Sequence, residues 1–166
     1  VQAGRSALNA RRGPNLVLQN ILFGGFFAGL ADFIYPTARS VIAGNSWMQP
    51  WKFVASGWFG APALEGGVGM VAVGVASHFL ICFVAAALLY VVVSRVKWVP
   101  RQWTVLGILY GVAFLVAMNY VILPLSGVAR SIYPLGEIHI AAIVHILVVG
   151  WPTAFFVSRA LEQSDG

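Results

Sequence analysis

Residues 68–93 read VGMVAVGVASHFLICFVAAALLYVVV, and His78 is the only side chain among them that can carry a positive charge. A helix needs about 20 apolar residues to cross about 30 Å of hydrocarbon, because it rises about 1.5 Å per residue. An isolated strand in the same place would leave its backbone donors and acceptors unpaired in lipid. This stretch therefore predicts a membrane-spanning α-helix.

Three more apolar stretches cover residues 16–34, 103–125 and 138–157, and polar breaks rich in glycine and proline separate them. The alternating pattern of a membrane β-barrel is not visible. We therefore expect an all-α, integral membrane four-helix bundle that forms a single membrane domain over residues 1–166. Residues 16–34 are interpreted as a retained span and not as a signal peptide, because the apolar run is long and contains Asp32.

The composition supports a membrane protein. Of the 166 residues, 60% are hydrophobic and 9% are charged, whereas soluble domains contain about 45–50% apolar and about 25% charged residues. So few charges cannot cover the surface of a soluble protein of this size. The same composition excludes a disordered chain, and the single cysteine excludes a domain held together by disulfides.

The basic residues predict an orientation, because cytoplasmic loops retain Lys and Arg. Seven basic residues flank the spans on the side of the N-terminus and three on the opposite side. We therefore expect a multi-pass protein of the bacterial inner membrane with both termini in the cytoplasm. The net charge of +5 then reflects topology and attraction to anionic headgroups, and nucleic acid is not an expected partner.

The long outer loop, residues 35–67, is expected to contain a short helix over about residues 50–60. Pro50 suits its first turn, and Trp51, Val54 and Trp58 fall in one narrow sector of a helix. Together with Trp47, Trp51 and Trp58 are predicted to anchor this interfacial helix at the headgroup level. The helix is either an amphipathic cover on the bundle or a lid or re-entrant element over a functional cavity.

Small residues recur four positions apart in every span, which predicts close helix contacts. The pairs are Gly25 with Gly29, Ala72 with Ala76, Gly107 with Gly111, and Gly150 with Ala154. Pro36, Pro124 and Pro152 are expected to mark helix ends or kinks.

Polar side chains inside the spans are the main functional signal, because each costs about 2.5–3.5 kcal/mol at mid-membrane unless it is paired or hydrated. With the topology above, nearly all of them fall in the outer half. The candidates for a ligand-binding or proton site are Asp32, Glu65, His78, Asn119, His139 and His145. We expect them to line a pocket that opens to the periplasmic side.

Several chemistries fit the two histidines of the spans, His78 and His145. They could be neutral imidazoles bonded to neighbouring helices, or axial ligands of haem b. The different depths expected for the two side chains in their helices argue against haem. A zinc or copper site that also uses Cys82 is a further alternative, although no close His/Cys motif supports it. No cofactor is predicted.

Asp32 has two interpretations, a structural partner of Asn119 or a histidine, or a proton or cation site. Hydrolase and nucleotide-binding motifs such as GxSxG, HExxH and the Walker loop are absent from the sequence. No catalytic residue is therefore predicted, and an enzymatic activity is not favoured.

Several short motifs resemble the YagU-type family of small bacterial inner-membrane proteins. They are the sequence GVASHF at 74–79, the loop 95–102, the glycines at 107 and 111, Met118-Asn119, PLSG at 124–127, His145 and Arg159. The resemblance covers roughly residues 65–160. It implies a four-helix inner-membrane protein without an assigned biochemical activity, in which His78 and His145 match the histidines of the family.

These observations favour a non-enzymatic accessory or partner-binding subunit, or a protein that binds a small ligand in an outward-facing polar pocket. The expected partners are the lipid bilayer and other membrane subunits or further copies of the chain. A proton- or ion-coupled transporter or channel component is the alternative, and a b-type haem protein for electron transfer is the third. The inner half of the spans is almost wholly apolar, which disfavours a conduit made by one chain.

Overall fold

The computed structural model describes residues 2–97, 99, 101–128 and 138–164, with side chains from residue 15 onward. Most of the described residues are helical, and none of them belongs to a strand. Four helical stretches are long and apolar enough to cross a membrane. These stretches are Asn15–Ile42, Val68–Arg95, Trp103–Leu125 and Ile138–Ser164. The prediction of an all-α four-helix membrane bundle is confirmed, and the chain is a multi-pass membrane protein.

The first span belongs to helix α1 (Gln2–Ile42), which continues beyond the expected end at residue 34. Pro36 lies inside this helix and does not end it, so the predicted helix end at this proline is wrong. Asp32 therefore lies ten residues before the end of α1. His78 lies ten residues after the start of α4 (Val68–Arg95), so the two side chains stand at the same depth.

The third and fourth spans each contain a π-helical segment. Helix α5 (Trp103–Ala117) continues into η1 (Met118–Ile122) and α6 (Leu123–Leu125). Helix α7 (Ile138–His145) continues into η3 (Ile146–Gly150) and α8 (Trp151–Ser164). Each π segment ends two residues before a proline, Pro124 or Pro152. Because proline lacks an N–H and its ring crowds the carbonyl four residues earlier, the preceding turn widens, and the span continues in a shifted register.

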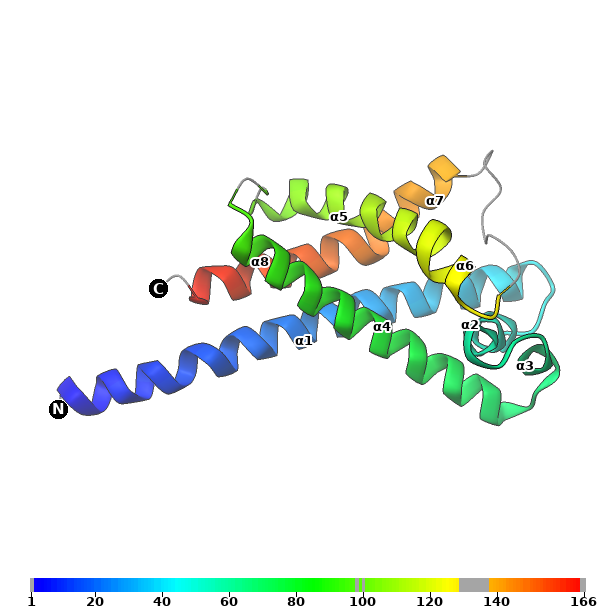
Figure 1. Ribbon diagram of the computed structural model, residues 1–166, viewed down its shortest axis with the longest axis horizontal. Helices are drawn as coiled ribbons and strands as arrows, with labels where there is room; N and C mark the ends of the chain where they lie inside the picture. Colours follow the sequence, from blue (N-terminus) through cyan, green and yellow to red (C-terminus); the bar gives the residue numbers. More distant parts are fainter. Residues whose placement is uncertain (1, 98, 100, 129–137, 165–166) are drawn as a thin grey trace.

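Helix α1 packs against α4 and α8, and α5 packs against α8 and η3. Both termini lie at one end of the bundle, and α2 and α3 lie at the other, which we call the α2 end (Figure 1). From the terminal end toward the α2 end, α4 and α5 diverge (Figure 1).

Glycines set the closest helix contacts, because they let backbones approach. A Cβ at Gly25 would meet the backbone of Phe83, and one at Gly150 would meet the carbonyl oxygen of Gly107. The predicted contact faces of α1, α5 and η3 are thus used. The predicted pair Ala72 and Ala76 is instead exposed, because Val71, Gly74, His78 and Cys82 form the buried stripe of α4.

The terminal end of the bundle has an apolar core. It consists of Leu89, Val93, Leu106, Ala154, Val157 and Leu161, each at most 8% exposed. The polar side chains of the spans therefore do not continue as a buried chain of ionisable groups through this part of the described structure.

Helix α2 (Gln49–Phe59) lies across the α2 end and appears nearly end-on when the long helices run across the view (Figure 1). Pro50 occupies its first turn, and Gly60 ends it with a positive φ of 67°, which glycine adopts without a steric cost. The short helix α3 (Pro62–Glu65) follows. Helix α2 packs on α4, so part of the outer loop covers this end of the bundle as a helix that lies crosswise to the spans.

Candidate functional site

Asp32 and His78 meet inside the bundle. Nε2 of His78 lies 2.9 Å from the carbonyl oxygen of Gly29, and because a carbonyl only accepts, Nε2 must donate. The other ring nitrogen, Nδ1, lies 3.9 Å from Oδ2 of Asp32. Their side chains are 10% and 23% exposed, respectively. The separation of Nδ1 and Oδ2 is too long for a direct hydrogen bond, so the two groups interact electrostatically.

His145 comes close to the same pair from the fourth span. Its Nδ1 donates to the carbonyl oxygen of Ala141 at 2.8 Å, and the side chain is 8% exposed. A Cβ at Gly111 of α5 would lie 2.6 Å from Cα of Ile146 and 3.0 Å from the carbonyl carbon of His145, so α5 packs closely against the backbone at the end of α7. Asp32 lies close enough to interact electrostatically with both His78 and His145. Asp32 and His78 therefore meet, and His145 lies within electrostatic range of Asp32. We call Asp32, His78 and His145 the Asp32 group.

Asn119 is buried, 6% exposed, on the π-helical segment η1. Its amide donates to the carbonyl oxygen of Leu115 in the same span at 3.0 Å. This bond satisfies one donor within the helix itself, as expected for a polar side chain in an apolar span.

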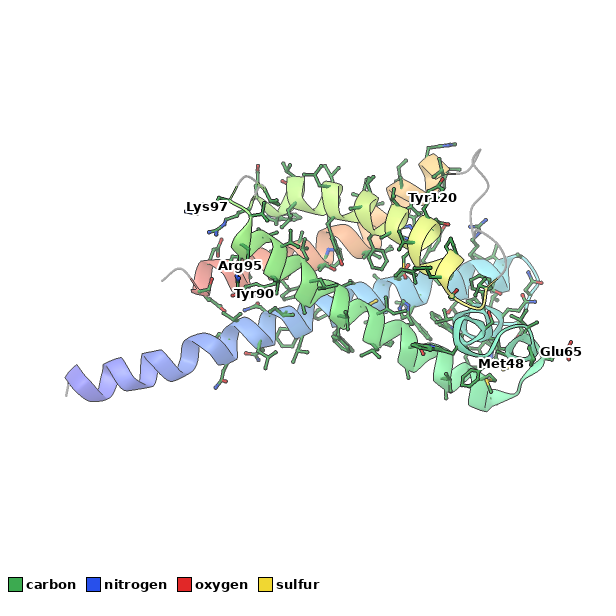
Figure 2. The ribbon with its side chains drawn as sticks, in the orientation of Figure 1. Met48, Glu65, Tyr90, Arg95, Lys97 and Tyr120 are labelled. Carbon is green, nitrogen blue, oxygen red and sulfur yellow. The ribbon has the colours of Figure 1, made fainter. Side chains whose placement is uncertain are left out.

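The other two predicted site residues lie at the surface. Glu65 is exposed at the end of α3 and points away from the bundle (Figure 2), and His139 is exposed near the start of α7. Neither belongs to the buried group around Asp32. Sequence position alone placed them at the rim of the spans, and the structure turns both side chains outward.

The ring of Trp51 packs against His78. The Trp51 ring stacks on Phe33 with the ring centroids 4.3 Å apart and meets His78 edge-on at 5.2 Å. The indole Nε1 donates to Oγ1 of Thr37 at 3.2 Å. Trp51 is 1% exposed, so it is a buried side chain and not the headgroup anchor that the sequence suggested. Trp47 and Trp58, the other two predicted anchors, are 48% and 69% exposed.

The periodicity of α2 did not reveal the inward role of Trp51, because tryptophan suits both a membrane interface and a buried contact. Phe33 and Thr37, which hold Trp51 in place, were not among the predicted residues. Their only signal is their position, one and five residues after Asp32 on the same helix. Trp58, at the other end of α2, donates from Nε1 to Oγ of Ser77 at 3.0 Å.

Two adjoining cavities open beside α2. The first, about 590 Å³, has a partly polar lining that includes Ser40, Gln49, Lys52 and Ser56. The second, about 450 Å³, is bounded by α2, α4 and the segment from η1 to residue 128, and its lining is mainly apolar. Both are lined by Phe53 and Val128. We call the two together the α2 cleft.

A backbone contact joins the segment after α6 to α2 beside the α2 cleft. The amide of Gly127 donates to the carbonyl oxygen of Gly57 at 3.0 Å. A Cβ at Gly127 would lie 2.9 Å from the carbonyl oxygen of Ser56. Glycine at 127 therefore permits the segment after α6 to reach α2. None of the described lining residues of the cleft is Asp32, His78 or His145.

Metal binding has little support in the described part of the chain. No group of three or more His, Cys, Asp or Glu side chains there could hold a metal ion. Sγ of Cys82 lies 4.0 Å from Nε2 of His78, and that nitrogen already donates to Gly29. The pair is thus a structural contact, and we propose no metal site.

Comparisons with protein-family models, curated proteins and solved structures found no match to this chain. The resemblance to the YagU-type family stays a prediction. Two features of the structure bear on the function, namely the α2 cleft and the buried Asp32 group.

Proposed function

We propose that this protein is a non-enzymatic membrane protein that binds a small amphiphilic ligand in the α2 cleft, as an accessory subunit or on its own. The observation that carries the proposal is the pairing of a partly polar cavity with an apolar one through the shared residues Phe53 and Val128. A ligand with a polar end and an apolar tail fits such a pair. Pockets of this size, lined mainly by apolar groups with a few polar ones, are typical of small-molecule sites.

The position of the α2 cleft also supports ligand binding. Helix α2 is fixed by Trp51 on the bundle side, and the side chains that follow, Lys52 and Phe53, line the cavities. A buried anchor beside the lining residues keeps the cleft preformed, which lowers the entropic cost of binding.

The sharpest test fills the apolar cavity from α4. Ile81→Trp adds bulk at a lining residue, and Leu80→Trp makes the same kind of change at a neighbour that is 58% exposed and outside the lining. Native mass spectrometry of protein released from membranes should show a bound amphiphile for the unaltered chain and for Leu80→Trp, and at least a severalfold loss for Ile81→Trp. Equal retention by both variants would refute the proposed function.

We also propose that the protein lies in the bacterial inner membrane with the α2 end on the periplasmic side. Arg95 and Lys97 lie near the terminal end (Figure 2), and the sequence places more basic residues on that side than at the α2 end. Cytoplasmic loops carry such an excess. An amphiphile in the α2 cleft would then come from the outer leaflet.

Proton exchange at Asp32 and His78 is a second candidate function. Oδ2 of Asp32 and Nδ1 of His78 are 3.9 Å apart, too far for a direct hydrogen bond, and an ionisable carboxyl group inside an apolar span supports a site that takes up and releases a proton. Infrared difference spectroscopy across a pH titration should reveal a carboxyl band that disappears in Asp32→Asn and persists in Glu65→Gln. A titration identical in both variants would contradict this candidate.

A further inference from the structure

We propose that the ligand of the α2 cleft is an anionic membrane phospholipid, with its phosphate beside Lys52 in the partly polar cavity and an acyl chain in the apolar cavity. This inference rests on the proposed function and names the class of ligand.

The partly polar cavity is suited to an anion. Lys52 is the only charged side chain among its described lining residues, and it is half-buried. Within the described parts of the chain, no acidic side chain pairs with Lys52, and Glu65 of the neighbouring α3 points away (Figure 2). A half-buried ammonium group without a carboxylate favours an anionic ligand that replaces part of its hydration. The amide of Gln49 adds a neutral hydrogen-bonding group.

The second cavity is suited to a hydrocarbon chain. Its lining includes Val54 and Trp58 of α2, Ile81 of α4, and Ile122 and Leu123 of the third span. Helix α2 crosses α4 at Gly74, and Ile81 lies about 10 Å further along the helix at about 1.5 Å per residue. The apolar lining thus extends from the level of α2 into the span, in the direction that an acyl chain takes from its headgroup.

The two cavities also lie on a route that a lipid can take. Helices α4 and α5 diverge toward the α2 end (Figure 1). The apolar cavity lies at this end, with α2 as its boundary there and Ile81 and Ile122 on its two sides. Ile122 is 45% exposed and Leu125 is 82% exposed, so the flank of this space is part of the apolar surface that faces the bilayer. A lipid can enter sideways, whereas a wholly water-soluble ligand gains nothing from the apolar cavity.

The test measures headgroup preference with a matched pair of charge changes. The full chain is purified in detergent and offered equal amounts of phosphatidylglycerol, which is anionic, and phosphatidylcholine, which is zwitterionic, and bound lipid is counted by native mass spectrometry. Lys52→Gln should lower the preference for phosphatidylglycerol about fivefold, the effect expected from one lysine near a lipid surface. Lys97→Gln removes the same charge from an exposed position near the opposite end (Figure 2) and should leave the preference unchanged.

A second arm separates the lipid from its headgroup. Short-chain phosphatidylglycerol should displace the bound lipid, whereas glycerophosphoglycerol, which has the same headgroup and no chain, should not. Equal displacement by both compounds would overturn the role of the apolar cavity. Equal losses of preference in Lys52→Gln and Lys97→Gln would overturn the headgroup site, because they would indicate a general effect of charge.

Failure of this inference can be told from failure of the proposed function. If Ile81→Trp displaces both lipids while Lys52→Gln changes nothing, the α2 cleft binds amphiphiles without regard to charge, and only the anionic class is wrong. If Ile81→Trp leaves the retention of both lipids unchanged, the proposed function itself fails.

Discussion

The backbone carbonyl of Trp51 rests against Gly74, and a side-chain Cβ at residue 74 would collide with it. This contact joins α2 to α4 at the point where α2 crosses the bundle. It places the ring of Trp51 over His78 on one side of α2, and leaves Lys52 and Phe53 to line the α2 cleft on the other. Glycine at 74 thus permits α2 to lie directly on α4.

Gly74→Ala should push α2 away from α4. Overpacking of a closed contact costs about 1–3 kcal/mol, so the free energy of unfolding in detergent should fall by about that amount. The control is Gly69→Ala on the same helix, where a new Cβ meets nothing within 4 Å. That change should be neutral or stabilise by up to about 1 kcal/mol, because glycine is unfavourable inside a helix. Equal melting temperatures of the two variants would contradict the contact.

Trp51→Ala should destabilise the protein far more than Trp47→Ala. Trp51 is 1% exposed, whereas Trp47 is 48% exposed. Removing a buried aromatic side chain costs about 3–5 kcal/mol, and surface changes usually cost less than about 0.5 kcal/mol. Thermal unfolding of both variants in one detergent provides the measurement. If Trp51 were instead an interfacial anchor, the two losses would be similar.

Asp32 and His78 should be coupled energetically. Alone, His78→Leu removes the bond to Gly29 and should lower the free energy of unfolding by about 1–2 kcal/mol. In a double-mutant cycle with Asp32→Asn, contacting residues show interaction free energies of about 0.5–3 kcal/mol. Chemical or thermal unfolding of the four proteins of the cycle gives the value.

The control is a second double-mutant cycle, in which Asp32 is paired with the exposed His139 in place of His78. Asp32→Asn and His139→Leu should have additive effects to within about 0.5 kcal/mol. An Asp32–His78 cycle that is additive to the same degree would show that the 3.9 Å pair contributes nothing to stability.

Labelling from outside the cell should reach the α2 end and not the loop between the second and third spans. The probes are single cysteines at Glu65→Cys and Lys97→Cys, both exposed positions, in a Cys82→Ala background that removes the buried native thiol. A membrane-impermeant maleimide should label the first in intact spheroplasts and the second only after permeabilisation. The reverse pattern would overturn the proposed topology.

Gly74 also illustrates why the helix contacts were only partly predictable. Small residues four apart mark faces that can pack closely, and Gly25 and Gly107 do so. Ala72 and Ala76 have the same spacing and are exposed. In a bilayer, an apolar side chain has a similar environment whether it faces lipid or another helix. The packing partner, here Trp51, therefore determines which small residue of α4 is buried.

From the sequence alone, hydropathy and length determined the four spans, since a helix must be long and apolar to cross a bilayer. Counting residues from their ends also placed Asp32, Asn119 and His145 in the outer half of the bundle, with His78 nearer the middle of its span. The tertiary structure alone decided that Trp51 turns inward, that Glu65 and His139 turn outward, and that Lys52 lines a cavity beside an apolar one. Those outcomes depend on where separate helices cross and diverge, because a cavity is a relation between chain segments that no single periodic pattern encodes.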